Sequence, residues 1–260
     1  MRFLLALLLA LAAGCATGPR IDTTYTSVNQ DSRVQFLVLH YTAEDWETSL
    51  RTLTQPSSRE VSSHYLIRDD PVIIYRLVDE SRRAWHSGVS SWRGNTQINA
   101  SSIGIEIVCL GDKGSPSDAL VFRDFAPGQL DAAIELVKDI VRRYNIRPEN
   151  VVGHGDVAPQ RRVDPGPKFP WKRLGELGII RWPDSGTVAH RRPEFEQALP
   201  DYSWFQEKLR RHGYEVPRNG ELDAPTRRVI SQFQMKYRPE RYDGTPDAET
   251  AAILSALVDP

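Results

Sequence analysis

Apolar runs alternate with helical patterns along most of the chain from Val34 onward. Short apolar runs predict strands near residues 36–40, 65–67, 72–77, 103–110 and 151–153, and a helix is expected through 49–53. Residues 127–145 carry the strongest amphipathic pattern, with Leu130, Ile134, Val137, Ile140 and Val141 at helical spacing. This alternation predicts an α/β fold, a sheet with helices on its faces that presents functional side chains at the strand ends.

The periodic pattern is interrupted between residues 183 and 200, and a helical pattern resumes after it. The interrupted stretch combines Pro, Gly and charged residues without a clear period, which predicts a linker. Residues 201–260 predict a small helical domain in which Asp223 and Asp247 mark helix N-termini. Its apolar positions are expected to form a core rather than a binding surface.

The amino terminus predicts export. Residues 1–14 combine a basic start with an apolar run that is too short to span a bilayer and fits a signal peptide. Cys15 follows small residues, which resembles the lipobox of bacterial lipoproteins, and residues 15–33 form the expected lipidated tether. Ala16 favours a lipid anchor in the outer membrane of a Gram-negative bacterium, facing the periplasm. The alternatives are ordinary cleavage, which gives a soluble periplasmic protein, and a disulfide between Cys15 and Cys109, which is the weakest because Cys109 follows an apolar strand and is expected to be a buried thiol.

Size and charge restrict the remaining function classes. A chain of 260 residues can bury one good core and a small second one. The net charge is −1, so we expect no nucleic-acid partner. A monomer is expected.

Residues 151–171 contain the most informative polar pattern, because His154 and Asp164 lie ten positions apart around a proline-rich loop. Imidazole and carboxylate groups are good zinc ligands, and a hydrolytic zinc site needs a third protein ligand and one open position. His40 is the candidate third ligand, at the end of the first apolar run. Iron(II) can use similar ligands, and such histidines can also satisfy local hydrogen bonds alone.

Glu106 is a second candidate functional residue. It lies in the apolar strand SSIGIEIV, where the period of two places Ile103, Ile105 and Ile107 on one face and Glu106 on the other. A carboxylate in such a strand is costly unless it is paired or used chemically. Both a buried salt bridge with an arginine and a general base that faces a metal are consistent with this position.

Three segments in this order carry a family resemblance: FLVLHYTA, WHSGVSSWRGNTQINASSIGIEIV and HGDVAPQRRVDPGPKFPW. Together they resemble the zinc-dependent N-acetylmuramoyl-L-alanine amidases, whose superfamily includes peptidoglycan recognition proteins and some phage endolysins. The resemblance covers residues 34–182 and implies a mixed central sheet with one zinc ion bound by His40, His154 and Asp164. Residues 201–260 resemble a three-helix peptidoglycan-binding domain.

The resemblance also implies an activity, the hydrolysis of the amide bond between the lactyl group of N-acetylmuramic acid and L-alanine of the stem peptide. Peptidoglycan and muropeptides are the expected substrates. Glu106 is expected to accept a proton from the attacking water and to protonate the departing amine. Arg162 is expected to help zinc hold the oxyanion, although many relatives carry lysine there and a guanidinium differs in reach and shape. Arg161 is expected to be a surface charge.

Further residues are candidates for a substrate groove, in which aromatic faces stack on sugar and polar groups hold peptide. The groove candidates are Trp85, His86, Trp92, Arg93 and His64. For Trp85 a core position is equally consistent with the sequence, and His64 can face either core or cleft. His190 and His212 are expected at the surface.

Three alternative functions remain. A non-catalytic peptidoglycan receptor belongs to the same superfamily, but such receptors usually lack a zinc ligand. An enzyme that recycles released muropeptides, including anhydro forms, differs from one that acts on intact wall only in substrate preference. An unrelated zinc peptidase is disfavoured because the chain has no HExxH motif.

Overall fold

The computed structural model describes residues 18–19, 21–58, 60–113 and 120–259. Among these described residues, those from Ser32 onward form one compact unit, and those up to Asp31 belong to a separate one. The expected signal peptide and Cys15 lie outside the described residues. Within the described ranges, no helix is long and apolar enough to cross a membrane.

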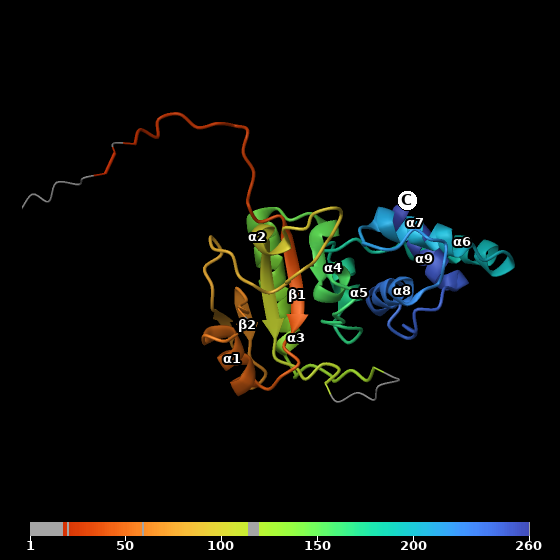
Figure 1. The fold of residues 1–260 in the computed structure, drawn as a ribbon, viewed down its shortest axis with the longest axis horizontal. Coiled ribbons are helices and arrows are strands. Elements are labelled where there is room, and N and C mark those ends of the chain that lie inside the picture. Colours follow the sequence, from red (N-terminus) through yellow and green to blue (C-terminus); the bar gives the residue numbers. More distant parts are fainter. Residues whose placement is uncertain (1–17, 20, 59, 114–119, 260) are drawn as a thin grey trace, which may run out of the picture. The chain divides into compact units, whose positions relative to one another are not determined.

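A mixed sheet forms the centre of the amidase-like region (Figure 1). In the described part of the chain its order is β3-β2-β4-β1-β5. The strands are β1 (Phe36–Tyr41), β2 (Tyr65–Ile67), β3 (Ile74–Arg76), β4 (Ser102–Ile107) and β5 (Val151–Gly153). Only β3 among these pairs antiparallel, with β2, so the carboxyl ends of β1, β4 and β5 meet at one edge.

Helices connect the strands and cover the sheet. They are α1 (Trp46–Thr54), α2 (Ile98–Ser101), α3 (Gln129–Tyr144), the short helix η1 (Pro148–Asn150), α4 (His154–Val157) and α5 (Trp171–Glu176). The long helix α3 packs its apolar side on one sheet face, where it shares a core with Leu37, Leu39 and the three isoleucines of β4. That packing confirms the predicted amphipathic helix and the predicted inward face of β4.

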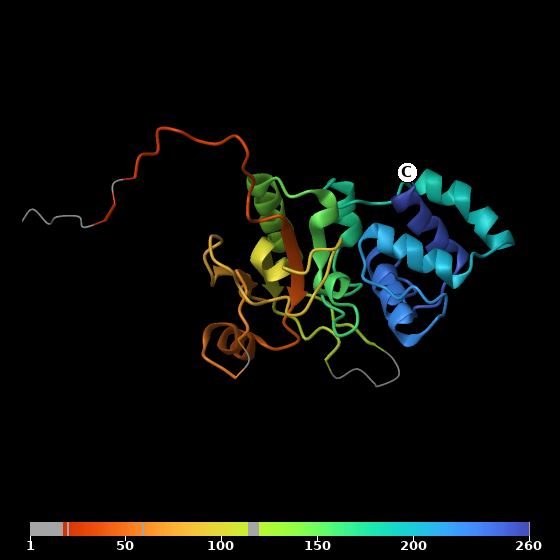
Figure 2. The same ribbon diagram turned by 45° about the horizontal axis from the view of Figure 1, so that its top comes forward.

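Four helices follow in the C-terminal region, drawn in cyan to blue in Figures 1 and 2: α6 (Ser185–Gln197), α7 (Tyr202–His212), α8 (Ala224–Tyr237) and α9 (Ala248–Val258). Each begins after an aspartate whose side chain accepts a backbone N–H three residues further on, as expected for Asp223 and Asp247. Helix α6 occupies much of the stretch for which a linker is expected. It is held to α9 because Arg191 donates to Ser255 and to the carbonyl of Asp259.

The C-terminal helices and the second sheet face belong to the same buried apolar cluster. That cluster joins Phe36, Val38 and Val152 of the strands to Phe205 and Phe233 of the helices. Because this apolar cluster is continuous across the two sets, residues 201–259 are packed as part of the same unit rather than suspended from it.

Candidate active site

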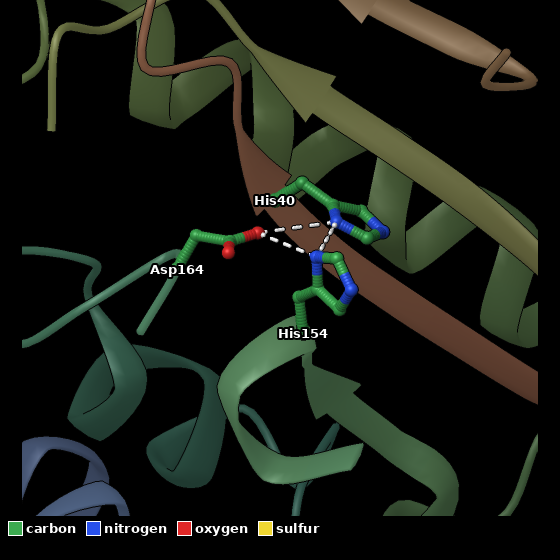
Figure 3. Close-up of side chains that lie close together, drawn as sticks. All are labelled: His40, His154 and Asp164. Atoms are coloured by element: carbon green, nitrogen blue, oxygen red, sulfur yellow. Dashed lines mark hydrogen bonds and ion pairs between the residues drawn. The ribbon is translucent and has the colours of Figure 1, made fainter. Parts of the chain in front are cut away.

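Three side chains meet at the carboxyl edge of the sheet. His40 lies near the end of β1, His154 begins α4 directly after β5, and Asp164 lies in the following loop. The Nδ1 atoms of His40 and His154 are 3.0 Å apart, and Asp164 Oδ2 lies 3.1 Å from the first and 3.2 Å from the second. Figure 3 shows the three groups pointing at one another. All three residues are buried. The structure thus brings together the ligand set expected from the sequence.

The hydrogen bonds around the two histidines determine which ring nitrogens carry protons. His154 Nε2 lies 3.1 Å from the carbonyl of Ser87, which can only accept, so this nitrogen carries the hydrogen. Ser102 Oγ donates to the carbonyl of Ile98 and therefore accepts from His86 Nε2. His86 Nδ1 must then accept from His40 Nε2, 3.1 Å away.

Both Nδ1 atoms are therefore free of hydrogen in the neutral rings. Burial lowers the pKa of His40 to about 4, with a further contribution from His154, so neutrality is favoured. Two nitrogen lone pairs and a carboxylate oxygen then converge without a proton to share, which is repulsive unless a cation lies among them.

The donor set fits zinc. Zinc bonds of about 2.0–2.1 Å in a regular tetrahedron place two ligand atoms about 3.3 Å apart, close to the 3.0–3.2 Å found here. Two imidazoles and one carboxylate also leave a fourth position for water or substrate.

Glu106 lies beside this triad. The parallel register of β1 and β4 pairs His40 with Glu106, and Glu106 Oε1 is 3.9 Å from His40 Nδ1. Its other oxygen, Oε2, is buried and has no hydrogen-bond partner in the described ranges. Burial raises the pKa of Glu106 well above its usual value, and the negative charge of Asp164 adds to the rise. The sequence-based orientation of Glu106 is confirmed, and its carboxyl group lies beside the triad with one oxygen, Oε2, unpaired among the described residues.

The two arginines of the loop have different environments. Arg162 is exposed, and its charge opposes the rise in the pKa of Glu106, so the guanidinium lies within electrostatic range of the site. Arg161, expected as a surface charge, is exposed but also donates to the carbonyls of Ser87 and Val89. Because the Ser87 carbonyl also accepts the hydrogen bond from His154 Nε2, Arg161 helps to fix the loop that orients His154.

The five groove candidates are not gathered into one surface. His64 and His86 are buried, and His64 accepts from the backbone N–H of Gly104. Trp92 is only 2% exposed and donates its indole N–H to the backbone carbonyl of Glu149. Arg93 is exposed and donates to the carbonyl of His212. Trp85 is 43% exposed, with the guanidinium of a neighbouring arginine, Arg83, over its ring.

Other expectations can be compared with the structure. Cys109 is a buried free thiol, as predicted, and His190 is exposed. The surface prediction for His212 is wrong, because the apolar side of α7 turns it into the shared cluster, where its ring packs against Trp92 and Tyr214. Ser87 and Ser102 were missed as partners of the site, since an isolated serine carries no sequence signal for contact with a distant histidine.

Comparison with known proteins places this geometry in a family. Residues 30–167 match the N-acetylmuramoyl-L-alanine amidase family, and residues 199–254 match a family of peptidoglycan binding domains. N-acetylmuramoyl-L-alanine amidase AmiD of Escherichia coli is 43% identical over 267 aligned positions, which cover 96% of this chain and 94% of AmiD. The anhydro-amidase AmpD of Citrobacter freundii is 39% identical over 117 positions, 45% of this chain and 57% of AmpD.

Solved structures agree over nearly the whole chain. The E. coli AmiD complex with anhydro-N-acetylmuramic acid-L-Ala-D-γ-Glu-L-Lys has a TM-score of 0.82 at 42% identity and covers 93% of this chain and 95% of that one. AmpDh3 from Pseudomonas aeruginosa has a TM-score of 0.86 at 42% identity, with 93% and 98% covered. This chain therefore belongs to the N-acetylmuramoyl-L-alanine amidase family.

Proposed function

We propose that this amidase is a zinc hydrolase in which His40, His154 and Asp164 hold the metal and Glu106 moves the proton. The observation that carries the proposal is the convergence of three hydrogen-free ligand atoms, 3.0–3.2 Å apart, beside a buried carboxyl with an unpaired oxygen. The bond to be cleaved joins the lactyl carbonyl of N-acetylmuramic acid to L-alanine. When bound, zinc supplies Lewis acidity, which lowers the pKa of a coordinated water to about 7 and polarises a carbonyl.

Glu106 acts twice in the proposed reaction. As water attacks the lactyl carbonyl, the carboxylate accepts the proton, and it then protonates the nitrogen of L-alanine as the amide bond breaks. This role is favoured because Glu106 Oε2 has no hydrogen-bond partner among the described residues, so this oxygen is available to exchange a proton with water or substrate. Burial and the negative charge of Asp164 raise the pKa of Glu106, which suits a group that must both accept and donate a proton.

Arg162 is proposed to stabilise the oxyanion that develops on the attacked carbonyl. Its guanidinium is exposed and forms no ion pair with any other described residue, while its backbone carbonyl accepts a hydrogen bond from Gln232. A fixed backbone with a free cationic end suits a group that must meet a substrate.

We further propose that the substrates include muropeptides that carry an anhydro sugar. The AmiD and AmpDh3 structures were determined with an anhydro-muramic tripeptide and an anhydromuramic pentapeptide, respectively. Both relatives match this chain over more than nine-tenths of its length, which supports the same substrate class.

The test is a digest of purified peptidoglycan and of a soluble anhydro-muropeptide, read by mass spectrometry. We expect free peptides beginning with L-alanine, lost with chelator, restored by zinc and lost in Glu106→Gln. Glu80→Gln is the matched control, since it makes the same change in a carboxylate that binds Arg143 rather than facing the triad. Protein that binds wall and zinc but releases no such peptides contradicts the enzyme proposal and supports a peptidoglycan receptor.

The cellular location is a separate proposal. We propose acylation of Cys15 and anchoring in the outer membrane on the periplasmic side, supported by the lipobox-like sequence before Cys15 and by the peptidoglycan substrate. Mass spectrometry of the processed N-terminus and membrane fractionation of Cys15→Ala test it. A processed protein without acyl groups that fractionates as soluble would instead support a soluble periplasmic enzyme.

A further inference from the structure

Helix α8 of the C-terminal region contacts the segment that carries the proposed metal ligands His154 and Asp164. Its Lys236 donates to Asp156 Oδ2 at 2.7 Å, and Asp156 lies two residues after the ligand His154, within the same helix α4. Lys236 and Asp156 are each only 4% exposed. This is a desolvated ion pair between the C-terminal helices and the element that presents a ligand.

Asp156 connects several parts of the site. Its Oδ2 also accepts from the backbone N–H of Gly153, at the end of β5, at 2.8 Å. Its Oδ1 accepts from the hydroxyl of Tyr214, another residue of the C-terminal region, at 2.5 Å. The ammonium of Lys236 lies 4.5 Å from the ring centre of Trp171, at the start of α5. The carboxylate is thus fixed from both sides by groups that are themselves buried.

A second contact acts on the same loop. Gln232, one turn before Lys236 on α8, donates to the carbonyl of Arg162 at 3.1 Å. Its carboxamide also packs so closely against Gly155 that a Cβ there would lie 2.1 Å from Gln232 Oε1. Gly155 in turn donates to the carbonyl of Asp164 at 2.8 Å, which closes the loop between the two ligands.

Helix α4 has four residues, too few to be stable alone, so tertiary contacts must fix its orientation. Removing one member of a buried ion pair leaves an uncompensated charge, which strongly perturbs its surroundings. Any rotation of α4 that relieves such a charge also moves the His154 ring, because both side chains leave the same helical turn.

We propose that Lys236 and Gln232 are positioning residues of the metal site, so the C-terminal helices set the ligand geometry in addition to any binding of wall. The proposal rests on the proposed function in taking zinc as the bound ion. It differs from tethering alone, which would raise local substrate concentration without altering the chemistry.

The test uses the full-length protein with zinc and, separately, with Co²⁺ as a spectroscopic probe. For Lys236→Met we expect zinc affinity to fall about 10–100-fold, the usual effect of losing a residue that orients a ligand. We also expect an altered Co²⁺ visible spectrum and a lower kcat on a soluble muropeptide, which offers no polymer for a tether to bind. Lys208→Met is the matched control, because it breaks an ion pair with Asp259 in the same region without touching the loop.

Several outcomes separate the possibilities. Asp156→Asn combined with Lys236→Met removes the unpaired charge, so thermal stability should recover while the Co²⁺ spectrum stays altered. If Lys236→Met does not fold, Gln232→Ala carries the same readouts. Parent-like zinc affinity, spectrum and kcat in a folded variant overturn the proposal. A parent protein that binds zinc but lacks amidase activity refutes the proposed function alone, because affinity and spectrum still test the positioning role.

Discussion

His86 accepts a hydrogen bond from His40, a proposed metal ligand, and replacing His86 gives a direct test of the site geometry. The proton on His40 Nε2 is accepted by His86 Nδ1 at 3.1 Å, in a region where His40 is 1% exposed and His86 is 6% exposed. His86→Leu replaces the imidazole with an apolar side chain of similar size and so removes the acceptor. His86→Asn retains an oxygen or nitrogen near the position of Nδ1.

The size of the effect follows from the buried N–H. A buried donor without an acceptor costs about 1–3 kcal/mol. His40 can avoid that cost by moving its proton to Nδ1 or by turning its ring, and either change removes a lone pair from the metal. The cost therefore falls on metal binding, and at about 1.4 kcal/mol per tenfold it corresponds to roughly 5–150-fold weaker zinc binding.

Zinc affinity is measured by competition with a chromophoric chelator, and stability by thermal unfolding of the metal-free protein. Ser63→Ala is the matched control, because Ser63 is fully buried and donates to Gly104 on β4 at 2.9 Å but touches no ligand. We expect weakened zinc binding in His86→Leu, partial recovery in His86→Asn and unchanged affinity in Ser63→Ala. Parent-like affinity in His86→Leu would refute the assignment of protons in the site.

Four further predictions follow from the same structure. Glu106→Gln should lower kcat about 10²–10⁴-fold in steady-state assays without abolishing zinc binding, and loss of the metal instead would contradict its proton-transfer role. Arg162→Ala should lower kcat about 10²–10³-fold, with Arg162→Lys retaining most activity; equal losses in both would argue against oxyanion stabilisation. Chelation should lower the Tm by roughly 5–10 °C where free zinc was about 100 times its Kd, and an unchanged Tm in calorimetry would show that the metal does not bind the folded state. Hydrogen bonds from Arg143, with smaller ones from two tyrosines, lower the pKa of Glu80 to about 2. The ionised carboxylate therefore stabilises the folded protein above the unfolded pKa of about 4.5, and this contribution is lost as the pH falls through about 2. Glu80→Gln should lower the free energy of unfolding by about 1–2 kcal/mol at pH 7, after allowing for solvent screening, and by progressively less at lower pH in urea titrations.

Elements with strong periodicity were predictable from the sequence. The predicted strands 65–67 and 151–153 match β2 and β5 at both ends, and the long amphipathic helix appears as α3. The alternation in β4 also gave the orientation of Glu106, because a period of two leaves one choice of face once the isoleucines are buried. Local pattern is sufficient where burial on one side decides the structure.

Features that depend on contacts between distant segments were not predictable. The helix α6 has a proline, Pro193, and no apolar stripe, so its stretch resembles a linker until the contacts of Arg191 with the end of the chain are known. His86 was expected to face substrate, whereas its partners, His40 and Ser102, come from two neighbouring strands. The sequence could indicate the ligands by residue type, but not the hydrogen bonds that orient them.

The apolar cluster shared by the sheet and the C-terminal helices has a consequence for how the chain is made. Phe36 and Val38 are among the first core residues to be synthesised, yet the cluster is complete only when the chain has reached Leu257. Contacts of such sequence separation form slowly. The core of the nascent amidase-like part is therefore incomplete, and its apolar residues stay exposed until the last helix is available. A chain truncated before α8 should aggregate rather than yield a working catalytic fragment.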